Sequence, residues 1–191
     1  MNRALDLAIA GTGLAVTSPV LAAAALAVKL GDGGPVLFKQ VRVGKDGRAF
    51  ELLKLRTMVV GAERQGAGYA VDRGDSRITL VGRLLRATSI DELPQLWNVV
   101  RGDMSVIGPR PTLRYQVERY TERQRRRLEV LPGITGWAQI HGRAALSWAE
   151  RIELDVWYVE HRSPLTDLLI LLRTPLALFG GTYKGETGGW R

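Results

Sequence analysis

Two adjacent acids, Asp91 and Glu92, are the strongest candidates for catalysis in this sequence. A carboxylate can attack a phosphorus atom once the phosphate charge is neutralised, and arginine forks and Mg²⁺ do this in proteins. Mg²⁺ is commonly held by one or two carboxylates together with substrate phosphates, so either acid is a candidate metal ligand. The chain also supplies cations for phosphate binding, namely Lys54, Arg56, Arg86, Arg110 and Arg143. This set of residues predicts phosphoryl transfer.

The acid pair also has a purely structural interpretation. Ser89 and Glu92 fit a capping box at a helix start, where acids only complement the helix dipole. Pro94 weakens this interpretation, because a helix that begins at Ile90 places the missing proline donor just beyond its first turn. The local pattern alone leaves capping and catalysis equally open.

Two predicted strands must position the first cations. Residues 36–43 and 50–58 have strand character, and the Asp-Gly pair in residues 44–47 favours a tight hairpin turn between them. The period of two places Lys54 and Arg56 on one face, about 7 Å apart, which suits a diphosphate. A solvated strand face is the alternative, although two cations that continue an apolar row are less expected there.

Predicted loops must position Arg110 and Arg143. Pro109 and Pro111 predict an extended, stiff segment, which can preorganise Arg110 between them. Residues 61–76 are rich in glycine and polar residues and are predicted to form a loop that orders over substrate. Residues 134–143 are also predicted to be a loop, with Arg143 at its end available to a ligand.

Three helices are expected in the second half of the chain. Residues 113–131 predict one long amphipathic helix with an inward face made of Leu113, Val117, Tyr120, Leu128 and Leu131. Its exposed face is predicted to be basic, through Arg123, Arg125, Arg126 and Arg127. Such a face is usually solvated surface, but beside a membrane each cation can gain about 1 kcal/mol from anionic headgroups.

The other two helices have clear start signals. Ser147 and Glu150 form a capping box that predicts a helix through His161. Ser163 and Pro164 start the last one, whose apolar run over residues 168–179 is interrupted by a charge and a proline. That interruption predicts a helix that lies in the membrane interface rather than across it.

The N-terminal segment is apolar enough for a membrane. Leu7 to Val28 spans 22 residues without a charged side chain, which is enough to cross a bilayer core of about 30 Å. Ser18-Pro19 near its middle predicts a sharp bend, and basic residues at both ends favour the cytoplasm for both. A re-entrant helix hairpin accounts for both the bend and the charges. The hydroxyls of Thr17 and Ser18 can donate hydrogen bonds to the carbonyls that the bend leaves unpaired. A true span, a signal sequence and a buried helix remain the alternatives.

Composition limits the other function classes. The chain has 191 residues and a net charge of +8, which favours anionic partners. It has no cysteine and two histidines, so zinc sites and thiol chemistry are not expected. Walker-type and Rossmann glycine loops are absent. A membrane-anchored nucleic-acid-binding protein is the rival hypothesis, but no readout motif supports it, and nucleic acid is not an expected partner.

The chain resembles the bacterial sugar transferases, small monotopic phosphoglycosyl transferases. The resemblance is carried by Ser18-Pro19, GPVLFKQVRVG at 34–44, KLRTM at 54–58, LRATSIDELPQLWN at 85–98, GDMSVIGPRP at 102–111 and PGITG at 132–136. It implies a helix-dominated α+β fold: a re-entrant membrane helix in residues 1–30 and a cytoplasmic-face catalytic domain in residues 31–191, with a small β-hairpin and a C-terminal interfacial helix. The lack of further N-terminal membrane helices is typical of the minimal catalytic forms.

The resemblance also implies a Mg²⁺-dependent, two-step reaction. The carboxylate matching Asp91 attacks the sugar-bearing phosphate of a UDP-sugar, releases UMP and forms a covalent phosphosugar, which a polyprenyl (undecaprenyl) phosphate then accepts. Glu92 matches an acid that positions metal or phosphate, and Lys54, Arg86 and Arg143 match nucleotide-side cations. The expected location is the cytoplasmic face of the bacterial inner membrane. The sugar, the pathway, the chain length of the lipid and the oligomeric state, a homo-oligomer included, are left open.

Overall fold

The computed structural model describes residues 2–65, 74–142 and 146–179. Its helices are α1 (Arg3–Asp32), α2 (Leu80–Ala87), α3 (Gln95–Arg101), α4 (Arg114–Val117), α5 (Glu122–Arg125), α6 (Trp137–Ile140), α7 (Trp148–His161) and α8 (Pro164–Phe179). Its strands are β1 (Leu37–Val43), β2 (Ala49–Leu55), β3 (Ser105–Ile107) and β4 (Gly133–Thr135). Short 3₁₀ turns lie at η1 (Lys45–Gly47), η2 (Ala62–Arg64), η3 (Ile90–Glu92) and η4 (Arg126–Leu128). The predicted helix-dominated α+β class is confirmed.

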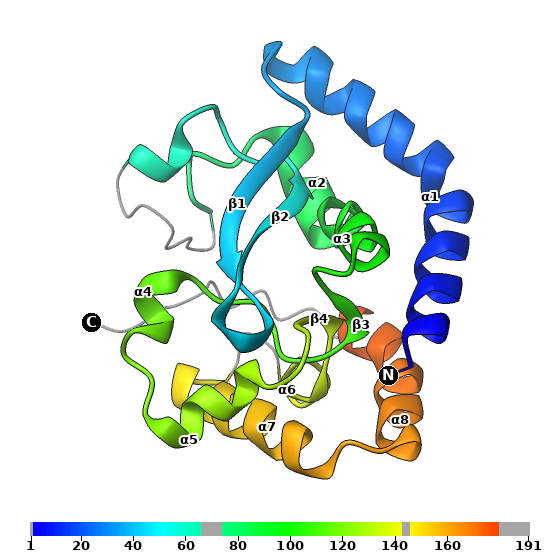
Figure 1. The fold of residues 1–191 in the computed structure, drawn as a ribbon. Coiled ribbons are helices and arrows are strands. Elements are labelled where there is room, and N and C mark those ends of the chain that lie inside the picture. Colours follow the sequence, from blue (N-terminus) through cyan, green and yellow to red (C-terminus); the bar gives the residue numbers. More distant parts are fainter. Residues whose placement is uncertain (1, 66–73, 143–145, 180–191) are drawn as a thin grey trace.

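Helix α1 is continuous over 30 residues, with Pro19 inside it. Proline has no N–H to reach the carbonyl of Ala15, and that carbonyl instead accepts a hydrogen bond from Ser18 Oγ at 2.8 Å. The Thr17 hydroxyl donates likewise to the Gly13 carbonyl at 2.6 Å. Figure 1 shows the helix changing direction midway, as expected for an internal proline. The bend and the assisting hydroxyls are confirmed, and re-entrant insertion stays a prediction.

Among the described residues, α1 is the one helix long and apolar enough to cross a membrane by length and composition. Its most apolar window has a mean hydropathy of 1.7, and 11% of that window is buried within the protein. The core helix of a soluble protein would be mostly buried. The low burial therefore leaves most of the apolar surface of α1 without a partner among the described residues.

Polar anchors attach the start of α1 to the rest of the protein. The buried carboxylate of Asp6 accepts hydrogen bonds from Ser105 Oγ and the Val106 amide, both at 2.8 Å. The guanidinium of Arg3 donates to the carbonyls of Val99 and Val100, near the C-terminal end of α3. The first half of α1 is thereby fixed against β3 and α3, and Ala10 enters their shared apolar cluster.

The predicted β-hairpin is confirmed, with β1 and β2 antiparallel from Leu37 opposite Leu55 to Val43 opposite Ala49. Asp46 and Gly47 in its turn have positive φ values of 55° and 75°, which suits an Asp-Gly pair. Asn98 of α3 binds the hairpin: its side chain accepts from the Leu53 amide and donates to the Glu51 carbonyl. These two hydrogen bonds fix the position of β2 relative to α3.

A second small sheet lies where loops were predicted. β3 and β4 pair in parallel, and α6 follows at once, so the prediction of a loop over residues 134–143 is wrong for its first part. The pairing needs a close backbone approach, since a Cβ added to Gly133 would lie 2.0 Å from the Gly108 nitrogen. Strands of three residues joined across a long separation leave no local periodicity.

The single amphipathic helix predicted over residues 113–131 is wrong, because the segment forms α4, α5 and η4 in succession. Thr121 starts a new helix with its own capping box to Gln124, which interrupts the first one. The predicted inward residues are buried or half-buried. Arg127, however, is 4% exposed and does not belong to the basic surface.

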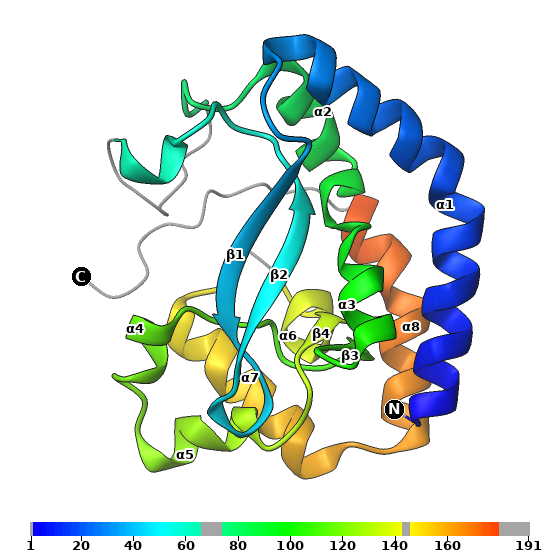
Figure 2. The ribbon, with the colours of Figure 1, turned by 45° about the horizontal axis from the view of Figure 1, so that its top comes forward.

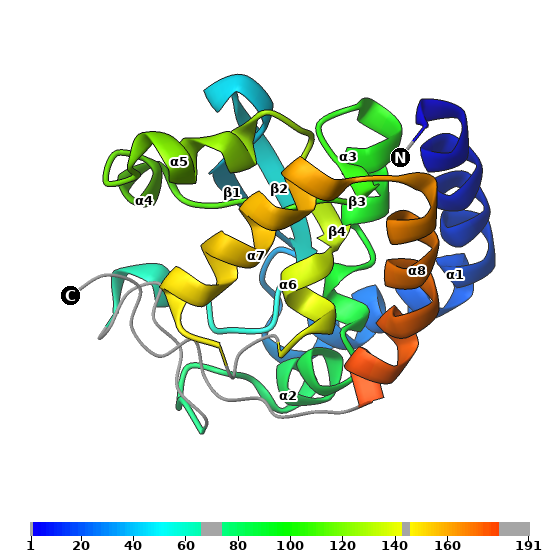
Figure 3. The ribbon, with the colours of Figure 1, turned by 90° about the horizontal axis from the view of Figure 1, so that it is seen from below.

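Helices α7 and α8 confirm the two predicted starts, and Ser147 caps α7 in a box with Glu150. Figures 2 and 3 show α8 beside the first half of α1, with α3 close to both. Ile170 of α8 shares a buried cluster with Ala10 and Val99. Four leucines along α8 are exposed, namely Leu165, Leu168, Leu172 and Leu176. α1 and α8 therefore lie near each other, and both carry apolar side chains that are exposed in the described part of the chain.

Candidate active site

The acid pair lies in η3, a single 3₁₀ turn between α2 and α3. Ser89 does not act as a helix cap: it has a left-handed φ of 57°, and its side chain makes no capping hydrogen bond. Pro94 stands at the N-cap of α3, so that helix begins after the acids rather than at Ile90. The capping interpretation of Asp91 and Glu92 is wrong. Ser89 is a non-glycine residue in the left-handed region, two positions before Asp91, and such strained backbone positions cluster at functional sites.

Glu92 is held by two of the predicted cations. Lys54 Nζ lies 2.9 Å from its Oε1, and Arg110 donates from Nη2 to Oε1 at 2.6 Å and from Nη1 to Oε2 at 3.4 Å. Burial opposes ionisation, but the charges of Arg110 and Lys54 outweigh it and hold the pKa of Glu92 well below its ordinary value. Glu92 is therefore an ionised anchor that brings a β2 lysine and the Pro109–Pro111 loop together.

Asp91 has a contrasting environment. It is 7% exposed, and no described residue forms a hydrogen bond or ion pair with its carboxylate. Burial raises the pKa of Asp91 to about 6, while the charges of Lys54, Arg86 and Arg110 act in the opposite direction and Glu92 adds to the rise. Two neighbouring carboxyl groups with pKa values moved apart are typical of sites where they have different chemical roles.

Of the two remaining predicted cations, Arg86 and Arg143, the structure locates the first. Arg86 stands in the last turn of α2, and its charge is one of those that lower the pKa of Asp91, so it lies near that carboxylate. Arg143 lies outside the described residues. The structure thus brings Lys54, Arg86 and Arg110 around the acid pair.

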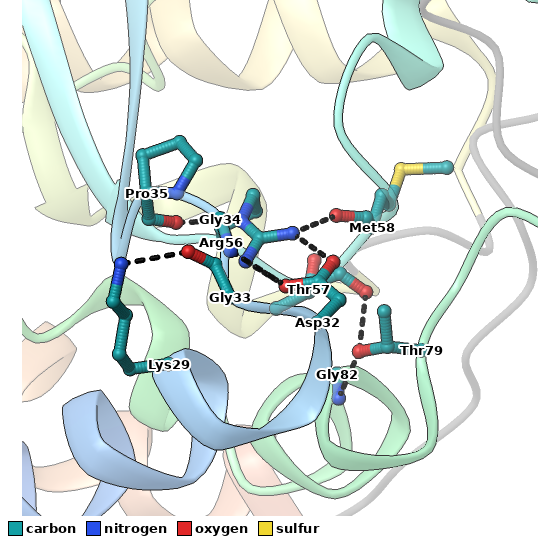
Figure 4. Close-up of polar contacts among 10 residues, drawn as sticks. All are labelled: Lys29, Asp32, Gly33, Gly34, Pro35, Arg56, Thr57, Met58, Thr79 and Gly82. Atoms are coloured by element: carbon teal, nitrogen blue, oxygen red, sulfur yellow. Dashed lines mark hydrogen bonds and ion pairs between the residues drawn. The ribbon is translucent and has the colours of Figure 1, made fainter.

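Arg56 is placed elsewhere, as Figure 4 shows. It is 6% exposed, its two Nη atoms bind the Asp32 carboxylate, and its Nε donates to the Pro35 carbonyl at 2.6 Å. This side-chain hydrogen bond lowers the pKa of Asp32 to about 2. The structure directs the two side chains to different carboxylates, Lys54 to Glu92 and Arg56 to Asp32, so their joint binding of one diphosphate stays a prediction. A phosphate contact from Arg56 stays a prediction that this geometry does not support.

A cavity of about 240 Å³ lies between the end of α1 and the start of α2. It is lined mostly by apolar residues, and the Arg56–Asp32 ion pair forms part of its wall. Thr79 closes the neighbouring wall by accepting from the Gly82 amide at 2.9 Å and donating to the Thr57 carbonyl at 3.4 Å (Figure 4). The Arg56–Asp32 pair therefore shapes the junction of α1, β2 and α2.

The carboxylate oxygens of the acid pair suit one Mg²⁺ ion that also binds phosphate oxygens of a substrate. No group of three or more His, Cys, Asp or Glu side chains occurs within the described ranges that could hold a metal unaided. The oxygens of Asp91 are not engaged in hydrogen bonds to described residues, whereas those of Glu92 face Lys54 and Arg110. One free carboxylate plus phosphate oxygens is an ordinary Mg²⁺ environment, so Asp91 fits the role of the metal-side acid better than Glu92.

Arg127 and Asp155 were not predicted as part of the site, yet they contact it. Arg127 donates to the backbone carbonyl of Arg110 at 2.9 Å and pairs with the buried Asp155. No helical period in the sequence signals the burial of Arg127, because α4, α5 and η4 do not form one continuous helix. Its neighbours Arg123 and Arg126 pair with Glu153 and Glu160 on the surface of α7.

The sequence matches a known protein family over most of its length. The family model described as bacterial sugar transferase matches residues 1–181. EpsL, an uncharacterised sugar transferase of Bacillus subtilis strain 168, is 50% identical over 174 residues, which cover 91% of this chain and 85% of EpsL.

Two relatives carry more specific names. A UDP-glucose:undecaprenyl-phosphate glucose-1-phosphate transferase of Caulobacter vibrioides is 46% identical over 181 residues, 91% of this chain and 67% of that protein. A UDP-N-acetylgalactosamine-undecaprenyl-phosphate N-acetylgalactosaminephosphotransferase of Aeromonas hydrophila is 41% identical over 187 residues, 95% of this chain and 44% of that protein. Since the family model covers nearly all of its length, the chain belongs to the bacterial sugar transferase family.

Proposed function

We propose that this protein transfers a sugar-1-phosphate from a UDP-sugar to a polyprenyl phosphate, with undecaprenyl phosphate as the acceptor, and releases UMP. The general reaction is supported by the names of the Caulobacter and Aeromonas relatives, which differ in the sugar. The observation that carries the proposal is the acid pair itself: a buried Asp91 without hydrogen-bond partners among the described residues, beside a Glu92 fixed by Lys54 and Arg110.

The first step uses Asp91 as the nucleophile. A carboxylate oxygen of Asp91 forms a bond to the sugar-bearing phosphorus, the phosphorus–oxygen bond to the uridine-side phosphate breaks, and UMP leaves with that electron pair. Lys54, Arg86 and Arg110 offset the negative charge of the diphosphate, which otherwise repels a carboxylate. The product of this step is an aspartyl-phosphosugar.

The second step returns the enzyme to its starting state. An oxygen of the polyprenyl phosphate attacks the same phosphorus, the bond to Asp91 breaks, and the carboxylate is regenerated. The product is a polyprenyl diphosphate-sugar, the first lipid-linked sugar of a glycoconjugate or exopolysaccharide. Splitting the transfer lets the water-soluble donor and the lipid acceptor use one site in turn.

Mg²⁺ is the proposed cofactor; it would be held by phosphate oxygens of the donor and by one oxygen of Asp91, which leaves the other oxygen of Asp91 to attack the phosphorus. When bound, it neutralises phosphate charge. Glu92 keeps Lys54 and Arg110 at the edge of the site, where they can bind the phosphates that Asp91 approaches.

The proposed location is the cytoplasmic face of the bacterial inner membrane, with residues 1–30 inserted as a re-entrant helix. The apolar α1, the exposed leucine row of α8 and the lipid substrates of the relatives support membrane association. Anionic headgroups remain proposed partners of the basic surface. The pairing of Arg123 and Arg126 with α7 carboxylates leaves exposed Arg125 as the better candidate from that run.

The test is UMP release from a panel of UDP-sugars by nanodisc-embedded protein with Mg²⁺. Without acceptor we expect a burst of about one UMP per enzyme, and with undecaprenyl phosphate continuous turnover. Asp91→Asn, which keeps the side-chain shape, should abolish both phases, while Asp46→Asn at the hairpin turn should not. A covalent phosphosugar on the Asp91 peptide should appear by mass spectrometry. Full activity of the Asp91→Asn protein would refute the proposed nucleophile.

A further inference from the structure

A buried ion pair contacts the loop that supplies Arg110 to the site. Arg127 of η4 is 4% exposed and Asp155 of α7 is 2% exposed, and the guanidinium binds the carboxylate through Nη2. Nη1 of Arg127 donates to the Tyr120 hydroxyl at 2.5 Å, and the guanidinium carbon lies 5.6 Å from the centre of the Tyr120 ring. Burial raises the pKa of Asp155 to about 6, while the charge and hydrogen bond of Arg127 act in the opposite direction.

Such a pair is not an efficient way to stabilise a fold. Removing two charges from water is costly, and an apolar pair of similar volume often stabilises a protein equally well. The neighbourhood already has apolar packing from Val117, Ile152 and Val156. A specific use of the charges is therefore worth seeking in what they contact.

The contact is the backbone of the site loop. Arg127 donates from Nη2 to the Arg110 carbonyl at 2.9 Å. The two flanking carbonyls are also held: that of Pro109 accepts from the Gly133 amide at 2.9 Å, and that of Pro111 from Arg42 Nη1 at 3.4 Å. Three consecutive carbonyls are thus fixed by donors from three different parts of the chain.

This backbone leaves Arg110 little freedom. Pro109 and Pro111 restrict the dihedral angles on both sides of it, and the held carbonyls fix the direction in which its side chain departs. The guanidinium then reaches both oxygens of Glu92. A change in the Arg110 carbonyl would be passed to Glu92 and hence to Lys54, which shares the Oε1 atom of that carboxylate.

We infer that Arg127 and Asp155 are positioning residues for the transferase: the buried pair holds the Arg110 carbonyl so that the Arg110 guanidinium stays on Glu92 and faces the donor phosphates. The inference rests on the proposed function. Neither residue contacts substrate in this role, and both act through Arg110.

The decisive variant replaces both charges at once, Arg127→Met with Asp155→Leu. A single change would leave an unpaired buried charge and destabilise the fold, whereas the double change is often neutral for stability. We expect the melting temperature to stay close to that of the native protein, while kcat for UMP release falls about 10- to 100-fold, the usual effect of losing a partner that orients a site residue. KM for the UDP-sugar should change much less. Normal kcat in a folded double variant would overturn the inference.

A matched control is available in the next residue. Arg126→Met with Glu160→Leu removes an arginine–carboxylate pair between the same two parts of the chain, but that pair is on the surface and does not contact Arg110. It should leave kcat unchanged. If the double core variant fails to fold, Arg127→Lys replaces it in the test, because an ammonium cannot span Tyr120, Asp155 and the carbonyl with one planar fork. Native kcat in a folded Arg127→Lys protein would equally overturn the inference.

A double-mutant cycle with Arg110→Met tests whether the buried pair acts on kcat through Arg110. If the pair acts through Arg110, adding Arg127→Met and Asp155→Leu to Arg110→Met should lower kcat less than twofold further. Multiplicative losses would contradict the inference. Absence of UMP release from the native protein across all donors would instead contradict the proposed function, so the two failures are distinguishable.

Discussion

At the scale of single residues, the site depends on how cations divide between two neighbouring carboxylates. Glu92 receives direct contacts from Lys54 and Arg110, whereas Asp91 is influenced by the same charges only at a distance. Burial affects both acids, so the difference in their pKa values comes from the contacts. A nucleophile that is already hydrogen-bonded to two cations would be a weak one. The arrangement leaves Asp91 available and keeps the cations close.

Lys54 should matter far more than another lysine of the same hairpin. Lys54→Met removes a charged donor that is 21% exposed and binds Glu92, and we expect kcat/KM for UMP release to fall about 100-fold. Lys39→Met is the matched control, because Lys39 pairs with Glu51 across the hairpin and is 59% exposed. The control should stay within twofold of the native rate. Equal losses in the two variants would show that the effect of Lys54 is general electrostatics rather than a contact at the site.

At the scale of secondary-structure elements, the residues of the site are brought together by contacts between short pieces. The hairpin supplies Lys54, α2 supplies Arg86 and the loop after β3 supplies Arg110. Asn98, the Asp32–Arg56 pair and the β3–β4 sheet fix these pieces to each other. Because few of these pieces are long enough to be stable alone, the site depends on the contacts between them.

One of these contacts has a distinct pH dependence. The folded-state pKa of Asp32 is about 2, below its ordinary value of 3.8, so the Arg56 contact contributes stability fully above pH 3.8 and loses it as the pH falls through about 2. Asp32→Asn should therefore melt at a lower temperature than the native protein at pH 7. The difference should shrink between pH 4 and pH 2, measured by circular dichroism in detergent. A constant difference over this range would show that Arg56 does not lower the pKa of Asp32.

A second contact allows no side chain at all. A Cβ at Gly133 would meet the Gly108 nitrogen at 2.0 Å and the Thr135 carbonyl oxygen at 2.5 Å, both backbone atoms that cannot move aside. We expect Gly133→Ala to cost about 3 kcal/mol, or roughly 6 to 12 °C in melting temperature. Gly11→Ala on α1, where nothing lies within 4 Å, should melt at or above the native temperature. A native melting temperature for Gly133→Ala would mean that β3 and β4 are farther apart in solution.

The elements that could be predicted from the sequence are those whose signals are local. The hairpin has a two-residue period and an Asp-Gly turn, and α7 has a capping box. The β3–β4 pairing and the contact of Arg127 with Arg110 join residues far apart in the chain, and no local pattern encodes them. Asp91 and Glu92 could be singled out as residue types, but the division of cations between them is a matter of three-dimensional packing.

At the scale of the whole molecule, both ends of α1 are attached to the rest of the folded chain. The start of the helix is held by the contacts of Arg3 with α3 and of Asp6 with β3, and its end by the contact of Asp32 with Arg56 after β2. Figure 1 shows α1 arching along the side of the molecule between these attachments. A helix that crossed the bilayer would separate its ends by about 30 Å of hydrocarbon and would draw β3, α3 and their polar groups into or across it.

The attachments therefore favour a helix that enters and leaves the membrane on the same side, and labelling can test this. The chain has no cysteine, so Asn2→Cys and Leu30→Cys each provide a unique thiol near one end of α1. We expect a membrane-impermeant maleimide to label neither variant in intact spheroplasts and both in inverted inner-membrane vesicles. Val41→Cys on β1, which is 64% exposed and distant in sequence from the helix, controls for access to the cytoplasmic face. Labelling of Asn2→Cys in intact spheroplasts, with Leu30→Cys protected, would establish a span and would require the contacts of Arg3 and Asp6 to break on insertion.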